Sequence, residues 1–398
     1  MRAVSTVRAP AVPFRVVPAG DREAVGEVWE HLESNGADTG LFASWAWTRT
    51  WLESFGPVVP HHFVVIGAAE EPIGVALMTV DRHRRGPFSF RRAHVGTAGE
   101  PAGETVFVER NRLVSAPDRL RDVAGALVEH IRTLPGVDET ALDGFLETDA
   151  SALLGAGTGW STGPEHARVV DLTLAGGEDV MQLFSRGVRK ELRRGQRFLG
   201  PLSVFWAEDE RTAQTYLDEL IALHQSRWQE RGLPGAFAAE RVRRFHAALV
   251  SQWVPSGRLA LIRVTSPQGL VGVRYAYVDR DRVLGYQTGW APSTDPRVSP
   301  GLVLQHAVLE EARRRGYHCW DYLAGTTQLK QRLSTGGYQL VWASHLRPGA
   351  RRAALHAART GRSLLQAASR PLAGWRGPAA ATLTAGPRRT RDAVARDA

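Results

Sequence analysis

Two stretches of this chain share a pattern that constrains the fold more than any other feature. Residues 72–82 read PIGVALMTVDR, and residues 270–280 read LVGVRYAYVDR. Each alternates like a half-buried strand, ends in a charged turn and follows another strand-like run, at 62–67 and at 258–264. A recurrence at about half the chain length predicts two halves built to one plan.

The elements that follow each copy support this prediction. In the first half a helical pattern at 117–133 precedes a short strand at 140–145, and in the second a helical pattern at 301–315 precedes a strand at 319–325. Helices and strands alternating in this way predict an α/β fold, with a mixed α+β sheet in each half.

The predicted domains are a first half at 14–165, a second half at 166–347 and an Arg-rich segment at 348–398. Residues 147–166 are rich in Gly, Ser and Thr and are expected to lie between the halves. In the last segment, an Ala-rich helix at 350–370 is expected to precede a disordered tail.

Three helical patterns open the second half, at 178–200, 211–231 and 238–253. The first stops at Gly200, which is followed by proline. Its arginines recur around the whole helix, which favours a solvated face over a groove for nucleic acid.

The positive charge of the chain is concentrated at its C-terminal end. The formal net charge is +9, and residues 349–398 hold ten arginines and two aspartates, so the rest carries about +1. No specific nucleic-acid partner is therefore expected for the halves. The tail is either a solvated appendage or a weak contact for an anionic membrane surface. One cysteine and no apolar run of about 18 residues predict a cytoplasmic protein.

Several kinds of catalytic chemistry have no motif in this sequence. No His, Cys, Asp and Glu cluster has metal-ligand spacing, so no metal is expected. The GxxxxGK[ST] and GxGxxG phosphate-binding patterns and the GxSxG elbow are also absent. These absences favour chemistry that works mainly by positioning a reactive cosubstrate.

The helix at 301–315 begins in an unusual way, with Ser299, Pro300 and Gly301. Serine is a good N-cap and proline suits the first helical position, so capping explains two of these residues. Glycine in a first turn destabilises a helix, and its value can be that a ligand reaches the backbone amides there. The sequence leaves a cap and an anion seat as alternatives.

Four segments, in their order and spacing, resemble a known family: LFASWAWTRTWLESFG at 41–56, RGVRKELRRGQRFL at 186–199, LHQSRWQERGLPGAF at 223–237 and the stretch from Ser299 to Gly325. The family is that of the GNAT acyltransferases of the CelD/BcsL type. It is distantly similar to the Fem-type aminoacyltransferases, which also carry two GNAT-like halves. The resemblance covers roughly residues 40–345.

The resemblance implies a tandem GNAT-like fold, and the charge distribution adds a basic C-terminal tail. It also implies an N-acyltransferase that moves an acetyl or other acyl group from acyl-CoA, most often acetyl-CoA, to an amine. An amino sugar or a cell-envelope precursor is the candidate acceptor. The alternatives are Fem-like aminoacyl transfer from tRNA, which predicts a basic channel, and a non-catalytic protein of polysaccharide or envelope assembly.

The family's cofactor path implies two sets of binding residues. The pantetheine is expected along the strand at 286–290, and the pyrophosphate at the helix start at 299–303. The residues concerned are Gln287, Thr288, Gly289, Ser299, Gly301, Leu302 and Val303.

Asp321, Tyr322 and Lys330 are the candidate catalytic residues. Asp321 is a base, a residue that orients the acceptor, or a cap for the turn at Thr326. The family tends to have tyrosine before Lys330, where this chain has Leu329. Tyr322 or water would then protonate the departing thiolate, or activity would be reduced or absent.

Five further residues are candidates for binding the acceptor. The face formed by His224, Arg227 and Trp228 lines a pocket or packs between the halves. Tyr286 begins the strand segment of the cofactor path, and Glu100 lies in the loop HVGTAGEPAGE at 94–104, which is an acceptor loop or a plain surface loop.

Overall fold

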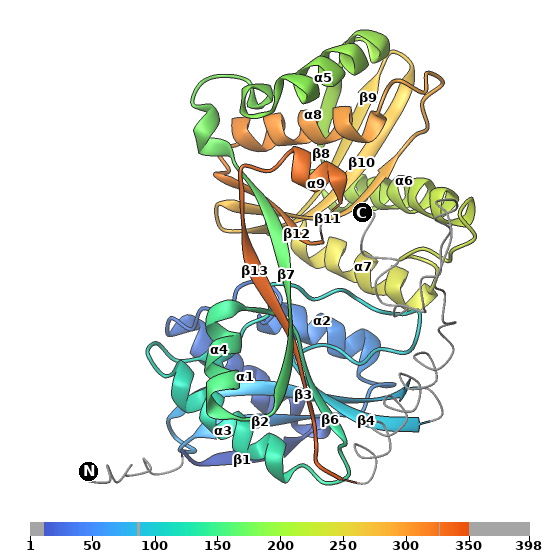
Figure 1. Ribbon diagram of the computed structural model, residues 1–398. Coiled ribbons are helices and arrows are strands. Elements are labelled where there is room, and N and C mark those ends of the chain that lie inside the picture. The colour runs from blue at the N-terminus through green and yellow to red at the C-terminus, as the bar shows by residue number, and fades with distance from the viewer. Residues whose placement is uncertain (1–11, 86–87, 326, 350–398) are drawn as a thin grey trace, which may run out of the picture.

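The computed structural model describes residues 12–85, 88–325 and 327–349. Their strands join into one thirteen-stranded mixed sheet, which runs through both halves of the molecule (Figure 1). The strand order is β1-β2-β3-β4-β6-β13-β7-β12-β11-β10-β9-β8, with β5 paired to β3.

The first half is a strand, two helices, an antiparallel meander, a helix, a strand, a short helix and a long strand. Their bounds are β1 Phe14–Pro18, α1 Arg22–Ser34, α2 Trp45–Phe55, β2 His61–Gly67, β3 Pro72–Arg85, β4 Phe88–Val95, β5 Val114–Ser115, α3 Leu120–Thr133, β6 Glu139–Leu146, α4 Glu147–Ala156 and β7 Trp160–Asp171.

After two short 3-10 turns and one helix, the second half repeats that order. Its elements are η2 Leu172–Ala175, η3 Val180–Leu183, α5 Arg186–Leu199, β8 Ser203–Trp206, α6 Glu210–Gln229, α7 Glu240–Trp253, β9 Leu259–Ser266, β10 Gly269–Asp279, β11 Arg282–Trp290, α8 Pro300–Arg314, β12 Cys319–Ala324, α9 Gln328–Arg332 and β13 Gly336–Leu346. The prediction of two similar α/β halves is confirmed.

The paired glycines of the sequence repeat have the same structural role in both halves. A Cβ on Gly74 of β3 would lie 2.5 Å from a methyl carbon of Val123, on α3. A Cβ on Gly272 of β10 would lie 2.8 Å from a methyl carbon of Leu304, on α8. Each glycine lets the helix after the meander approach the second of its three strands closely.

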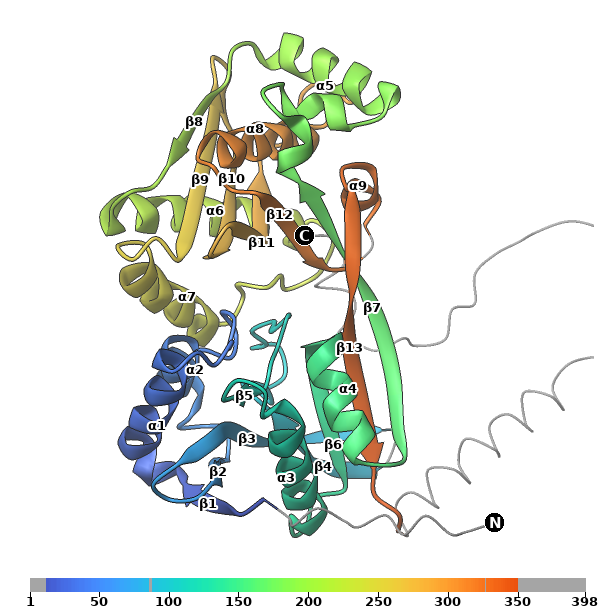
Figure 2. The ribbon, with the colours of Figure 1, turned by 90° about the vertical axis from the view of Figure 1, so that its left-hand side faces the viewer.

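The two halves are joined by their last strands. β7 ends the first half but pairs with β12 of the second, and β13 ends the second half but pairs with β6 of the first. β7 and β13 also pair with each other over ten positions, and they run along the molecule from one half to the other (Figures 1 and 2). The sheet of the second half is therefore extended by β7 of the first half, and the sheet of the first half is extended by β13 of the second.

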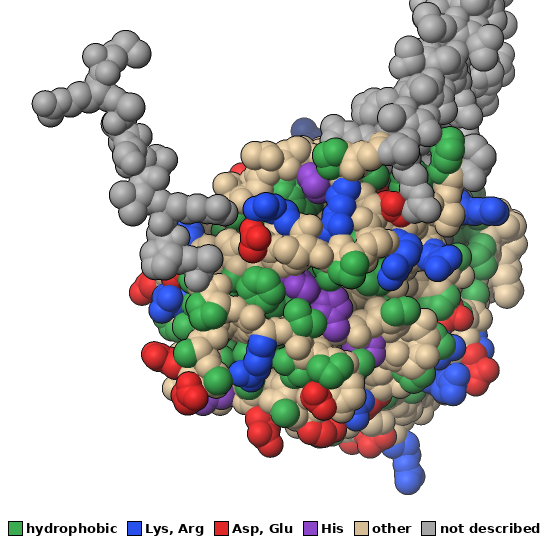
Figure 3. Space-filling view, turned by 90° about the horizontal axis from the view of Figure 1, so that it is seen from below, with side chains coloured by type: hydrophobic (Ala, Val, Ile, Leu, Met, Phe, Trp, Pro, Cys, Tyr) green, Lys and Arg blue, Asp and Glu red, His purple; other side chains and the backbone are tan. Residues whose placement is uncertain are grey.

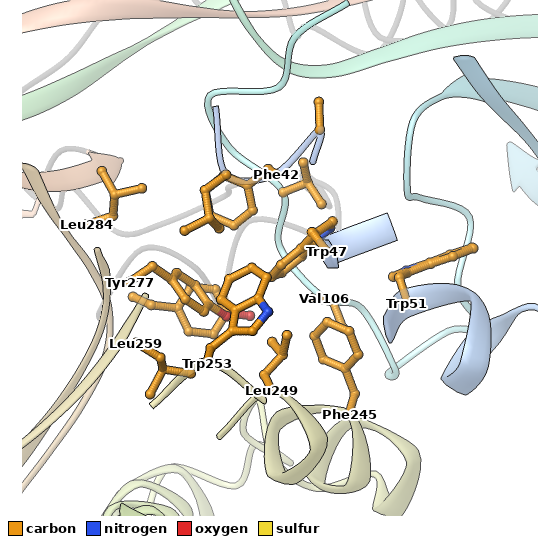
Figure 4. Close-up of a cluster of buried hydrophobic side chains, with 14 of the residues drawn as sticks. Phe42, Trp47, Trp51, Val106, Phe245, Leu249, Trp253, Leu259, Tyr277 and Leu284 are labelled. Carbon is orange, nitrogen blue, oxygen red and sulfur yellow. The ribbon is translucent and has the colours of Figure 1, made fainter. Parts of the chain in front are cut away.

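A shared hydrophobic core also holds the halves together. Trp47 of α2 makes edge-to-face contacts with Phe245 of α7 and with Tyr277 of β10, at ring-centroid distances of 5.2 and 5.7 Å. Figure 4 shows Trp47, Phe42, Trp253 and Tyr277 packed together between elements of both halves. Burial of such large aromatic surfaces stabilises this junction.

Two predicted segments differ from the structure. Residues 147–166 form α4 and the first part of β7. The helix predicted at 178–200 begins only at Arg186, because Asp179 caps a separate 3-10 turn and Ser185 then caps α5. The predicted stop holds, since Gly200 has a φ of +81°.

No helix in the described part of the chain is long and apolar enough to cross a membrane. The predicted helix at 350–370 and the Arg-rich tail lie outside the described residues.

Candidate functional site

The sheet opens between β11 and β12. The two strands pair in parallel only through residues 282–284 and 319–321. Beyond them β11 stays paired with β10, whereas β12 has an irregular register against β7. Leu323, at the irregularity, has a φ of +59°, which side chains other than glycine rarely adopt. The divergence leaves a small cavity of about 20 Å³, called the slot, between 285–287 on β11 and 322–324 on β12.

The matching gap in the first half, between β4 and β6, is filled by the chain itself. The amide of Asn111 donates to the carbonyl of Gly144 at 2.8 Å, and its carbonyl accepts from the amide of Leu146 at 3.0 Å. The side-chain amide of Asn111 also donates to the carbonyl of Val95 at 3.3 Å. Of these two equivalent gaps, the one in the second half is therefore the candidate binding slot.

The first half also supplies residues to that slot. Phe107 and Glu109, from the loop between β4 and β5, line it together with Lys330 of α9. The carboxylate of Glu109 accepts a hydrogen bond from the backbone amide of Ala324. Sequence reasoning missed Glu109, because its loop has no periodicity and lies far from the second half along the chain.

Glu109, which is partly buried, and Lys330, which is buried, are two titratable groups that line the slot. Burial raises the pKa of Glu109 to about 7, against the opposing charge of Lys330. Burial lowers the pKa of Lys330 to about 8, and Glu109 opposes that shift as well. The Lys330 ammonium donates to the carbonyl of Ala324 at 2.6 Å. Near neutral pH this pair can both accept and donate protons.

Asp321 lies behind the slot, fully buried and held by several donors. One carboxylate oxygen accepts from the hydroxyl of Tyr338 at 2.8 Å and from the guanidinium groups of Arg282 at 3.1 Å and Arg110 at 3.4 Å. The other accepts from the amide of Leu323 at 2.8 Å. Asp321 thus fixes the bulge of β12 and holds Arg110, the neighbour of Glu109.

Tyr322 lines the slot, and its hydroxyl is buried without a hydrogen-bond partner among the described residues. Burial raises the pKa of Tyr322, while Arg274 acts in the opposite direction. A neutral hydroxyl in this position is available to a ligand as a donor.

Tyr286 and Glu100, predicted from different halves, meet at the junction. Burial raises the pKa of Tyr286, and the charges of Glu109 and Glu100 raise it further. Glu100 accepts from the indole of Trp51 at 2.8 Å, and burial raises its own pKa to about 7. Two carboxyl groups from the first half therefore lie near the strand that borders the slot.

The start of α8 is well explained as a cap. The Ser299 hydroxyl accepts from the amide of Leu302 at 3.4 Å, and the Ser299 carbonyl accepts from the amide of Val303 at 3.2 Å. A Cβ on Gly301 would lie 3.4 Å from the ring of Trp290. At this distance a Cβ would be in ordinary van der Waals contact with Trp290, so packing does not explain the glycine, and an anion seat at 299–303 stays a prediction.

The three predicted pantetheine residues on β11 are closely packed. Gln287 is buried, and its side-chain oxygen has no partner among the described residues. Thr288 accepts a hydrogen bond from Arg274. A Cβ on Gly289 would lie 2.9 Å from the backbone carbonyl of Leu220, so that α6 covers this part of the strand. Gln287 is the member of this set that lines the slot.

The trio predicted on α6 divides into two environments. His224 accepts from the indole of Trp228 at 2.9 Å, both are buried, and burial lowers the pKa of His224 to about 4. Arg227 lies 3.8 Å above the ring of Trp290, next to the start of α8. The three residues pack inside the second half, and their role in binding an acceptor stays a prediction.

The described ranges hold no group of three or more His, Cys, Asp and Glu side chains that could bind a metal ion.

Comparison with known families and folds gives one domain match and a broad structural likeness. The family described as an acetyltransferase (GNAT) domain matches residues 183–331, which include the slot strands and Lys330. No curated protein sequence matches the chain.

Two solved structures are similar across most of the chain. FemX is 10% identical, with a TM-score of 0.52, and the match covers 81% of this chain and 96% of FemX. The C-terminal domain (DUF2156) assigned to a lysylphosphatidylglycerol synthetase from Agrobacterium fabrum is 13% identical, with a TM-score of 0.51, and the match covers 86% of this chain and 97% of that domain. At these identities the likeness concerns the fold alone.

Proposed function

We propose that the protein is an N-acyltransferase that moves an acyl group from acyl-CoA to an amine, on the premise that residues 183–331 match the acetyltransferase (GNAT) domain family. The observation that carries the proposal is the slot between the diverging strands, with Glu109 and Lys330 at its side. Acetyl-CoA is the simplest cosubstrate of this class, and the predicted path from 299–303 along 286–290 leads to the slot.

The reaction needs a neutral amine, and Glu109 is placed to provide it. In its ionised form Glu109 takes a proton from the incoming ammonium group. The amine nitrogen then attacks the thioester carbonyl, the carbon–sulfur bond breaks as the amide forms, and the second proton that the nitrogen loses restores the group that protonates the thiolate. A pKa near 7 suits a general base, because the group is partly ionised at neutral pH and still binds a proton well.

The departing thiolate and the developing oxyanion need donors. Tyr322 lines the slot and has a buried hydroxyl without a partner among the described residues, and Lys330 carries a proton near neutral pH. We assign proton donation to the thiolate to Tyr322, in place of the family tyrosine that Leu329 replaces. Lys330 stabilises the oxyanion, and Asp321 acts indirectly by holding Arg110 beside Glu109.

The acceptor is proposed to reach the slot from the junction between the halves. Glu100, Glu109 and Tyr286 lie there together, and they suit a cationic amine. An amino sugar or a cell-envelope precursor is such a compound, and this choice of acceptor rests on family analogy.

The two lysines of the chain offer a matched test. Lys330 is buried in the slot, and Lys190 is exposed on α5. Release of CoA thiol from acyl-CoA is measured with a panel of amines. Lys330→Met is expected to lower kcat at least a hundredfold with little change in the affinity for acyl-CoA, whereas Lys190→Met leaves both unchanged. Equal activity of the two variants, or no acyl-CoA binding to the wild type by calorimetry, would rule out this function.

The rival with aminoacyl-tRNA as donor predicts a basic channel. On the face of the first half shown in Figure 3, basic and acidic side chains are interspersed. Transfer from charged tRNA together with a failure to bind acyl-CoA would favour the rival.

A further inference from the structure

Arg274 of β10 is a buried cation without a carboxylate partner among the described residues. Its side chain is 4% exposed, its single hydrogen bond goes to the hydroxyl of Thr288, and its Nε has no partner there. Burial lowers the pKa of Arg274 to about 10, so the guanidinium stays charged at neutral pH. The guanidinium carbon lies 5.5 Å from the centre of the Trp320 ring, and no carboxylate in the described part of the chain neutralises the charge.

An unpaired buried charge is strongly destabilising. The penalty for removing such an ion from water is several kcal/mol in real proteins, and buried charges are normally paired. Burial without a partner is therefore expected where an external anion completes the site.

The guanidinium lies next to Gly285, one of the residues that line the slot. A Cβ on Gly285 would lie 2.1 Å from one guanidinium nitrogen of Arg274 and 2.9 Å from the indole nitrogen of Trp320, so both crowd the same point. Gly285 and Tyr322 line the slot, and the charge of Arg274 acts on the Tyr322 hydroxyl. Gly285 has no side chain because Arg274 occupies that space.

This point lies at the acyl end of the proposed cofactor path. Trp290 packs beside the start of α8, and Gly285 is five residues earlier on β11. At a rise of about 3.3 Å per residue, the two positions are roughly 16 Å apart. The guanidinium is thus remote from the proposed pyrophosphate seat and close to the place where the strands begin to diverge.

We propose that Arg274 binds a carboxylate carried by the acyl group, so that the donor is a CoA thioester of a dicarboxylic acid; this inference rests on the proposed function. The planar guanidinium can donate two parallel hydrogen bonds to a carboxylate. The indole of Trp320 and the hydroxyl of Tyr322, both buried and unpartnered among the described residues, add donors near it. Arg274 is already charged before the reaction begins. It therefore suits an anion that the substrate carries when it binds, such as a carboxylate, better than the thiolate that forms only during the reaction.

The test compares two thioesters of equal chain length, succinyl-CoA and butyryl-CoA, by calorimetry. Wild-type protein is expected to bind succinyl-CoA at least tenfold more tightly. Arg274→Gln removes this preference mainly by weakening the binding of succinyl-CoA, and Arg274→Lys keeps part of it. The control Arg263→Gln also removes one arginine, from the neighbouring strand β9, but Arg263 is paired with Glu219 and the preference is expected to persist.

The outcomes separate this inference from the function beneath it. Equal affinity of wild-type protein for the two esters overturns the carboxylate site and leaves the acyltransferase proposal standing. If Arg274→Gln loses turnover equally with both esters, the arginine acts on the leaving thiolate, and the carboxylate site is overturned. Failure to bind either ester refutes both proposals. The comparison of the two esters with wild-type protein tests the carboxylate site even if a variant does not fold.

Discussion

Glu109 is a residue of the first half whose carboxyl lies in the slot of the second. Its pKa is raised to about 7, and that of Lys330 is lowered to about 8. As a base Glu109 must be ionised, and as an oxyanion donor Lys330 must be protonated. We therefore expect kcat/KM to rise with pH through about 7 and to fall above about 8, with both limits belonging to the coupled pair.

Glu109→Gln removes the base but keeps a side chain that can accept from the amide of Ala324. The rising limb is expected to disappear, and the rate at pH 7.5 to fall at least a hundredfold. The measurement is the pH profile of CoA thiol release for both proteins. A Glu109→Gln enzyme with the wild-type profile would remove Glu109 from the mechanism.

Glu100 is a second residue with a raised pKa, and it gives a prediction about stability. Burial raises its pKa from 4.5 to about 7, so the folded protein holds this proton more tightly than the unfolded chain. Stability from this group is complete below pH 4.5 and falls as the pH rises to about 7. Glu100→Gln keeps an acceptor for Trp51 and is expected to raise the free energy of unfolding at pH 8 by about 2 kcal/mol.

Urea titrations at pH 5 and pH 8 measure this effect. The variant is expected to lose little stability between the two values, whereas the wild type loses more. The exposed Glu71→Gln serves as the control and should follow the wild type. Equal pH dependence in wild type and Glu100→Gln would mean that the carboxyl is not held protonated.

At the scale of elements, the glycines of the repeat are where the helices meet the sheet. Gly272→Ala is expected to destabilise the fold by about 1–3 kcal/mol, because the new Cβ would lie 2.5 Å from the carbonyl of Gly289 and 2.8 Å from Leu304. Gly125→Ala is the matched control. It places the same methyl group at an exposed position of α3, where no atom lies within 4 Å of the new Cβ, and should stabilise the fold by roughly 0.5–1 kcal/mol.

Thermal melts of the two alanine variants provide the measurement. Opposite shifts in Tm are expected, downward for Gly272→Ala and upward for Gly125→Ala. An unchanged Tm for Gly272→Ala would mean that α8 can move away from β10 without loss.

The sequence predicted helices and strands better than it predicted contacts between residues that are far apart along the chain. Alternation and repetition placed the first two strands of each meander, α3, α8 and the short strand after each, because hydrophobic periodicity follows directly from local geometry. The start of α5 was wrong, since Asp179 and Ser185 are both good caps and only packing selects between them. Lys330 stood out in the sequence because it is one of only two lysines. Glu109 could not be predicted, because its position in the slot depends on how the two halves join.

The whole molecule is more tightly coupled than two tandem domains connected by a linker. The strands β7 and β13 exchange between the halves, and the aromatic core of α2, α7 and β10 spans their junction. The slot itself needs both halves, because Phe107 and Glu109 close it from the first. Such coupling predicts that the halves fold and unfold together, although chains of this length often unfold in steps.

Trp47→Ala tests this coupling. Trp47 is fully buried, contacts Phe245, Trp253 and Tyr277 of the second half, and donates to the hydroxyl of Thr97 at 2.9 Å. Its loss is expected to cost about 3–5 kcal/mol. Hydrogen exchange in denaturant should then accelerate to the same extent in β3 and in β10, with a single transition. Exposed Leu174→Ala should change neither, whereas a β3 that opens while β10 stays protected would show that the halves are independent folding units.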